Sequence, residues 1–477
     1  MGEIENIEPA HLRFQRIMAL AALTAAAIFL PGCKGIPTQG ERQSRADLKA
    51  VTQDYRPGDR KAALPTLDTN ATLSALLTYA MLNQPRVEAA YYDYAAAVER
   101  VTTARSWPDP QFTFQMDIQN VVTSIMPGLM GSIPWPDKLR VGAEVASAES
   151  RGKYFAFQSV VLESAFEVKR TYYQLYFLAE KIRVNQETLQ LLGELEKLAR
   201  AQNEVGKVTL QDVLRAQIEQ VRLRTEIANL EDSRSSLLAQ FKAALGLGAN
   251  DPMPPIPGRF ESTSLDLTAE KLLETALAQN QRLKALEAEV RAAEASIILA
   301  RKAARPDFSL GFMADVKMNP TLNRPLGTVS LPIWRDKIAA QIAEAQANKR
   351  SAQARLSDEQ IALAVDVAER SFLYRQATRN LALLNDQLLP KARQSLEVAR
   401  SAYLAGQTDF FNLTDTERTL LGFKLDKVEA TAQREIVLAE LSLIIQGMPP
   451  ANPSNAAETS SMSRGKPVAP RKMNGGM

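Results

Sequence analysis

Residues 112–118 read Phe-Thr-Phe-Gln-Met-Asp-Ile. Apolar and polar side chains alternate at every position, which predicts a β-strand with one apolar and one polar face. Residues 308–316 alternate in the same way. Each run has about ten residues, the length that a tilted strand needs to cross a bilayer. We expect a lipid-facing set of Phe112, Phe114, Met116, Ile118, Phe308, Leu310 and Phe312.

Weaker return strands are expected around Leu129–Ile133 and Gly327–Leu331, so each chain supplies four candidate strands. Four strands cannot close a membrane barrel, because the smallest such barrels have about eight. Open strand edges are excluded from lipid, since their backbone groups would stay unpaired. Three copies would supply twelve strands. The alternative is a water-exposed hairpin whose apolar face packs against protein.

The sequence contains an internal repeat. Residues 104–112 align with 300–308, Ser132-Ile133-Pro134 with Ser330-Leu331-Pro332, and Asp137-Lys138-Leu139 with Asp336-Lys337-Ile338. Residues 70–250 and 269–448 are therefore predicted to be two copies of one unit, joined by a linker at 251–268. The tail, residues 449–477, is rich in Pro, Ser, Asn and Gly and is expected to be disordered.

Each copy is expected to hold a helix of about 35 residues (Leu73–Ser106 or Ala269–Ala304), a hairpin, a long helix ending near Gly206 or Gly406, and a return helix. Pro390 should kink the second long helix or start a new segment. Apolar positions at Leu214, Ile218 and Val221 continue through Thr225 and Ala228 in steps of four and three, which predicts a narrow coiled-coil seam. A soluble coiled-coil rod or bundle is the alternative.

The N-terminus has the features of an export signal. Arg13 and Arg16 precede an apolar run that is followed by Leu30-Pro31-Gly32-Cys33. This pattern resembles a bacterial lipoprotein signal, with residues 1–32 removed, Cys33 lipidated, and 33–69 an anchored extended segment. In such lipoproteins an Asp after the cysteine retains the protein at the inner membrane, so Lys34 implies the outer membrane. An ordinary signal peptide followed by an incidental cysteine is the alternative.

Composition excludes several function classes. The chain has 57 Lys+Arg against 54 Asp+Glu, a balance that argues against a nucleic-acid binder. With one Cys and one His, a disulfide framework within the chain and a Cys/His zinc site are both excluded. We find no phosphate-binding loop or catalytic triad, so no catalytic residue, cofactor or metal is predicted, and we expect that the chain is not an enzyme.

Three motifs, taken with the repeat, carry a family resemblance. Residues 205–214, Val-Gly-Lys-Val-Thr-Leu-Gln-Asp-Val-Leu, resemble a helical turn of TolC-type outer-membrane efflux proteins. Leu388-Leu389-Pro390 followed by residues 403–409 is typical of the second repeat of that family, and residues 133–139 are similar to its barrel-to-helix transition in lipoprotein members.

The resemblance implies an α+β membrane protein: a homotrimer with a 12-stranded outer-membrane β-barrel that continues into a long periplasmic α-helical barrel. It would be the lipid-anchored channel of a tripartite efflux system, with a periplasmic adaptor (membrane fusion) protein and an inner-membrane transporter of the resistance-nodulation-division type. A type I secretion duct and a lipid-anchored periplasmic scaffold without a pore are the alternatives, and the cargo stays open.

The resemblance also implies residue roles. The periplasmic tips that contact the adaptor would be Val205, Gly206, Lys207, Val208 and Thr209 in one turn, and Leu404, Ala405, Gly406, Gln407 and Thr408 in the other. Asp212 and Asp415 are candidates for a gate, because threefold symmetry would turn either into a ring of carboxylates that attracts cations. A solvated Asp near a helix start is the simpler interpretation of each.

Overall fold

The computed structural model describes residues 37–67, 71–118, 122–252, 254, 269–318 and 320–446, and these are mostly helical. The predicted signal peptide, Cys33 and the predicted tail lie outside the described residues, as does most of the predicted linker. The chain divides into two compact units. The first draws on Met1–Lys61, Ala90–Phe157 and Arg282–Asp358, the second on Ala62–Ala89, Gln158–Gln281 and Glu359–Met477. Each unit therefore contains segments from both halves of the sequence.

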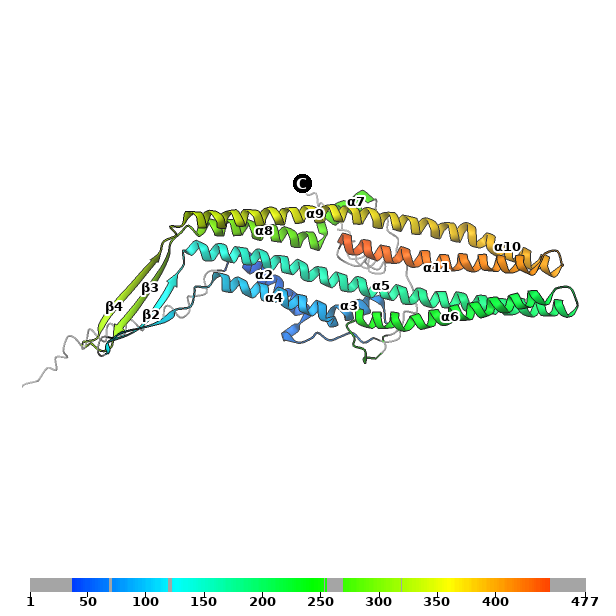
Figure 1. The fold of residues 1–477 in the computed structure, drawn as a ribbon, viewed down its shortest axis with the longest axis horizontal. Helices are drawn as coiled ribbons and strands as arrows, with labels where there is room; N and C mark the ends of the chain where they lie inside the picture. Colours follow the sequence, from blue (N-terminus) through cyan, green and yellow to red (C-terminus); the bar gives the residue numbers. More distant parts are fainter. Residues whose placement is uncertain are drawn as a thin grey trace, which may run out of the picture. The chain divides into compact units, whose positions relative to one another are not determined.

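The two halves of the chain show the same order of elements (Figure 1). After α2 (Gln39–Tyr55) and the short η1 (Pro57–Asp59), the first half comprises α3 (Leu73–Asn83), α4 (Pro85–Arg105), β1 (Gln111–Ile118), β2 (Val122–Ile133), α5 (Pro136–Glu204) and α6 (Leu210–Ala244). The second half comprises α7 (Ala269–Gln279), α8 (Gln281–Lys302), β3 (Asp307–Asp315), β4 (Leu322–Ser330), α9 (Arg335–Leu383), the π-helical turn η2 (Leu384–Leu388), α10 (Leu389–Leu404) and α11 (Phe410–Gln446). Pro390 lies in the first turn of α10, so a new segment starts there.

Two local expectations were wrong. The segment 33–69 is not extended throughout, because Gln39–Tyr55 form helix α2, whose first turn is capped by the Thr38 hydroxyl accepting from the Glu41 N–H at 3.2 Å. The first helix of each half is also interrupted. Pro85 ends α3, since a residue before proline is driven to extended backbone and Gln84 has ψ 120°.

In the second half the interruption at Asn280 coincides with a long-range contact. The Asn280 side-chain amide donates to the Ile444 carbonyl at 3.2 Å, as Asn83 donates to the Gly246 carbonyl at 3.0 Å. Both carbonyls lie at or just beyond the end of a return helix, where helical backbone lacks partners. The break therefore caps a distant helix terminus.

The four strands form one antiparallel sheet in the order β1-β2-β3-β4. Strand β2 begins earlier than expected, at Val122, and β4 at Leu322. Helices α5 and α6, and likewise α10 and α11, form antiparallel hairpins joined by short turns (Figure 1).

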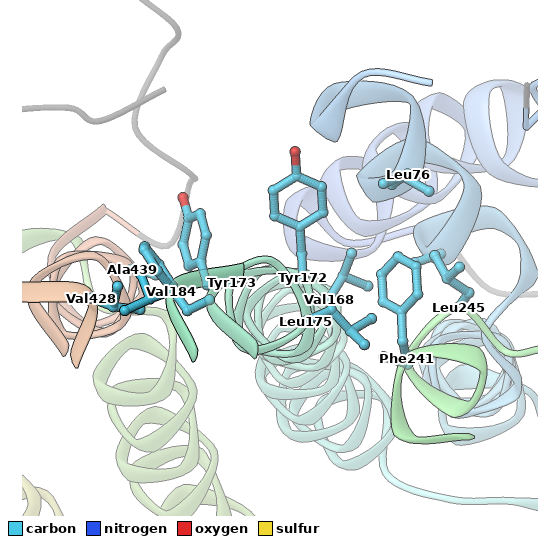
Figure 2. Close-up of a cluster of buried hydrophobic side chains, with 13 residues drawn as sticks. Leu76, Val168, Tyr172, Tyr173, Leu175, Val184, Phe241, Leu245, Val428 and Ala439 are labelled. Carbon is cyan, nitrogen blue, oxygen red and sulfur yellow. The ribbon is translucent and has the colours of Figure 1, made fainter. Parts of the chain in front are cut away.

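The largest buried cluster surrounds the middle of α5 (Figure 2). Val168 and Leu175 lie beside Phe241 of α6, whereas Val184 faces Val428 of α11. A second cluster fills the ends of both hairpins and includes Leu195, Val213, Tyr403, Phe410 and Leu413. Because α5 packs on two sides, it links the two hairpins within the second unit.

Candidate functional site

The strand layer sorts its side chains onto two faces. Phe112 is opposite Leu129, and Leu129 is opposite Phe312, so the three share one face. The same face carries Phe114, Met116, Phe308, Leu310, Ala314 and Val329. Phe112 is 72% exposed, and most of its large neighbours are exposed too. Ile118 is also exposed, beyond an irregularity in the register. A contiguous apolar face of this kind marks an interaction surface.

The opposite face is more polar. Thr113 is opposite Gly128, which is opposite Met313, and the face also carries Gln111, Gln115, Ser132, Ser309, Asp307 and Thr328. The Ser124 hydroxyl donates to the Asp315 carboxylate at 2.5 Å across the sheet. The alternation predicted from residues 112–118 and 308–316 is thus present in the folded sheet.

Both outer strands of the sheet have an unpaired edge within the described residues. β1 pairs with β2 alone, and β4 pairs with β3 alone. Every residue of β4 is exposed, and β1 is exposed at all positions but one. Free edges of this length are a template for pairing with another chain.

The two predicted tips are the turns of the helical hairpins. Gly206 has φ +71° and Gly406 φ +72°, backbone that other residues adopt at a cost. The Lys207 N–H donates to the Gln202 carbonyl, and the Gln407 N–H to the Ala402 carbonyl, both at 2.9 Å, so the two turns share one helix-ending pattern. Leu404 is the last residue of α10 and, like Val205, is exposed.

Helix α6 carries two apolar seams. The predicted seam of Leu214, Ile218 and Val221 is exposed, and Ile218 is 62% exposed. The seam buried against the rest of the chain consists instead of Val213, Ala216, Gln220, Leu223 and Ile227. Sequence spacing revealed a seam but could not tell which partner covers it.

Near the tips, charged side chains join the two hairpins. Arg418 of α11 forms an ion pair with Glu219 of α6. Asp212 lies near Tyr403, whose pKa is raised to about 12 by burial and by the negative charge of Asp212. Asp415 is exposed one turn from Arg418. The structure therefore brings Asp212 to the contact between hairpins and leaves Asp415 on the surface.

Glu417 was missed by sequence analysis. It is 2% exposed on α11, its two carboxylate oxygens have no hydrogen-bond partner among the described residues, and burial raises its pKa to about 7. Glu196 of the other hairpin is the opposite case. Hydrogen bonds from Gln217, Arg200 and Gln220 hold its pKa down at about 2. The one signal in the sequence was a Glu between Leu413 and Leu420 on a helical seam.

The described residues contain no group of three or more His, Cys, Asp and Glu placed to hold a metal ion. Among the helices that the structure describes, none is long and apolar enough to span a membrane.

Comparisons with known proteins agree with this arrangement. The model of the family "outer membrane efflux protein" matches residues 76–247 and 272–446, more than half of the chain. The pyoverdine export outer membrane protein OpmQ of Pseudomonas putida is 24% identical over 274 residues, 55% of this chain and 57% of the relative. The cobalt-zinc-cadmium resistance protein CzcC of Cupriavidus metallidurans is 23% identical over 288 residues, 58% of this chain and 64% of the relative.

The match thus spans less than two thirds of these two relatives. Among solved structures, CusC, described for its transmembrane channel formation, superposes with a TM-score of 0.70 at 16% identity. The superposition covers 82% of this chain and 95% of CusC, so the likeness extends over the fold.

Proposed function

The chain belongs to the outer membrane efflux protein family, and we propose that it forms the outer-membrane channel of a tripartite efflux system. The observation that carries the proposal is the strand layer. One exposed face is apolar across all four strands, and both edges are free to pair within the described residues. Lipid can cover the face and further copies can cover the edges.

A homotrimer satisfies both requirements. Three copies bring twelve strands, which close one barrel and leave no unpaired edge in the bilayer. The exposed seam at Leu214, Ile218 and Val221 supports the same assembly, because an apolar stripe at coiled-coil spacing needs a helical partner. In the trimer the helices form a barrel in the periplasm, and the internal repeat supplies two similar hairpins per copy.

The hairpin tips are the proposed contact with a periplasmic adaptor. The turns 205–209 and 404–408 expose Val205 and Leu404 beside glycines of positive φ, which offers short apolar ends to a partner. An inner-membrane transporter, of the resistance-nodulation-division type, would supply the energy, and the channel itself would catalyse nothing. Rings of Asp212 or Asp415 about the threefold axis would favour cations at the entrance.

The cargo is proposed to be small molecules or ions. One relative is named for pyoverdine export and the other for resistance to cobalt, zinc and cadmium. Lipidation of Cys33 after removal of residues 1–32 would anchor the mature chain in the outer membrane. In this organisation the two repeats, 70–250 and 269–448, share one channel wall.

Reconstitution of the purified chain into planar bilayers tests the function. We expect single-channel conductance, and a trimer in the mass spectrum of the detergent-solubilised protein. A silent monomer would overturn the proposal and favour the periplasmic scaffold, because a scaffold needs neither a pore nor closed strands.

Two variants test the ends of the molecule. Cys33→Ser should abolish incorporation of labelled fatty acid, and equal labelling of the variant would refute lipidation at this site. Gly206→Asp should weaken cross-linking to the adaptor, because an Asp residue is strained at φ +71°. The trimer should persist, because a Cβ added at this position has no neighbour within 4 Å to disrupt. Unchanged cross-linking would refute a docking role for this turn.

A further inference from the structure

The connection between β2 and α5 is held by contacts within the chain. Lys138, the third residue of α5, forms an ion pair with Asp307 at 2.7 Å and donates to the Arg305 carbonyl at 2.8 Å. The backbone N–H of Trp135 donates to the other carboxylate oxygen of Asp307 at 3.0 Å. The indole ring of Trp135 also lies 6.3 Å from the ring of Phe308. Asp307 is the first residue of β3, so these contacts fasten the end of β2 to the start of β3 at the rim of the sheet.

The connection between β4 and α9 has a Trp and a Lys at the equivalent positions, but within the described residues it lacks the contacts that Trp135 and Lys138 make. Lys337 is the third residue of α9 and is exposed, and Trp334 is 72% exposed. Neither side chain has a partner among the residues that the structure describes. Asp109, which precedes β1, is likewise exposed and unpaired in the described part of the chain. Asp109 therefore lies beside the free edge of β1, and Trp334 and Lys337 lie beside the free edge of β4.

The sheet register makes the two hairpins equivalent at a spacing of 198 residues, which shifts the sequence alignment of residues 104–112 with 300–308 by two residues. Phe112 is opposite Leu129 in the first hairpin, and Leu310 is opposite Gly327 in the second. Both pairs differ by 198 in residue number, as do Asp109 and Asp307 and the two Ser-x-Pro segments that end β2 and β4. The contacts of the connection between β2 and α5 therefore predict which contacts the connection between β4 and α9 should make.

We infer that Lys337 forms an ion pair with Asp109 of the partner subunit, and that β4 pairs antiparallel with the partner's β1 with Val329 opposite Phe112 of the partner subunit. The inference rests on the proposed trimeric channel and specifies its interface. Lys337 and Asp109 repeat the pairing of Lys138 and Asp307. Val329 and Phe112 repeat the pairing of Gly131 and Leu310.

The orientation of the side chains supports this register. Val329 is opposite Phe308 and shares the apolar face, to which Phe112 also belongs. A slip of one residue would place Phe112 among polar side chains, because alternate residues point to opposite faces. A slip of two residues keeps the faces but separates Lys337 from Asp109 by about 7 Å along the strand. The ion pair therefore distinguishes registers that the apolar pattern alone would accept.

Cysteine pairs introduced into the full chain in outer-membrane vesicles test the register. Val329→Cys with Phe112→Cys should cross-link under mild oxidation into covalent dimers and trimers, since opposite residues bring their Cβ atoms within disulfide reach. Cross-linking of Val329→Cys with Phe114→Cys would indicate a slip of two residues. Cross-linking of Val329→Cys with Thr113→Cys would indicate a slip of one residue, which places Phe112 on the opposite face. Chains with only one of the two introduced cysteines show whether Cys33 contributes to the cross-links.

Charge exchange tests the ion pair. Lys337→Asp should lower the temperature at which the trimer dissociates in detergent, and adding Asp109→Lys should restore it. Arg335→Asp, in the same turn and without a partner among the described residues, should have little effect. Two results on a stable, conducting trimer would overturn the inference and leave the proposed channel function standing. One is cross-linking through Phe114→Cys, and the other is a dissociation temperature that Asp109→Lys does not restore. A monomer that conducts no ions overturns the proposed function and this interface with it.

Discussion

Glu417→Gln is expected to remove a pH dependence from the second hairpin. Glu417 lies on the seam of α11, one turn from Leu413 and one turn from Leu420, and its carboxylate has no hydrogen-bond partner among the described residues. Burial raises its pKa to about 7 from the usual 4.5, and Lys424 opposes that shift weakly. Because the packed hairpin binds this proton more tightly than an open one, packing is favoured at acidic pH.

The magnitude follows from the two pKa values. At 1.36 kcal/mol for each tenfold change in proton affinity, the packed hairpin loses about 3 kcal/mol between pH 4.5 and pH 7. The loss is complete above pH 7. Gln cannot ionise, so the variant should keep its packing energy constant across this range.

Hydrogen exchange measured by mass spectrometry on the intact protein, at pH 5 and at pH 8, reports the local opening of α10 and α11. After correction for intrinsic exchange, wild-type amides there should be protected at least tenfold less at pH 8, and the Gln variant equally at both. Glu196→Gln is the matched control: its pKa is held at about 2, so wild-type Glu196 is ionised throughout this window. Identical pH profiles for wild type and Glu417→Gln would refute the reasoning.

Three further outcomes are expected. Arg105→Ala should destabilise α2 by up to about 3 kcal/mol in urea denaturation, because it leaves the fully buried Glu41 with one arginine fewer. Arg86→Ala removes an exposed ion pair and should cost below about 1 kcal/mol. Ile218→Asp should shift the detergent-solubilised protein from trimer toward monomer in mass measurements, because it places a charge in the exposed seam of α6. Phe312→Arg should lower folding stability in lipid vesicles by about 2–4 kcal/mol, and no loss in refolding titrations would contradict a lipid-facing position.

The main helices and all four strands could be predicted from the sequence, because their signals are local. Alternation at 112–118 and 308–316 gave the strands and their faces, and glycines 206 and 406 gave the hairpin turns. Pro390 gave a segment boundary in the same way. Each signal depends on a residue and its near neighbours along the chain.

The contact made by Asn280 could not be predicted, because its partner is the carbonyl of Ile444, more than 160 residues away. The same limit applies to the ion pair between Arg418 and Glu219 and to the burial of Glu417. No spacing in the sequence distinguishes these side chains from the many exposed ones of the same type.

The order of residues along the chain specifies which segments form strands and helices and which of their faces are apolar. Which apolar face is used inside the chain depends on how the helices pack in the folded protein. On α6 the seam through Val213 is buried and the seam through Ile218 is exposed, although both have helical spacing. Periodicity fixes the direction of a side chain relative to its own helix, whereas burial depends on which other helix comes to lie against that side chain.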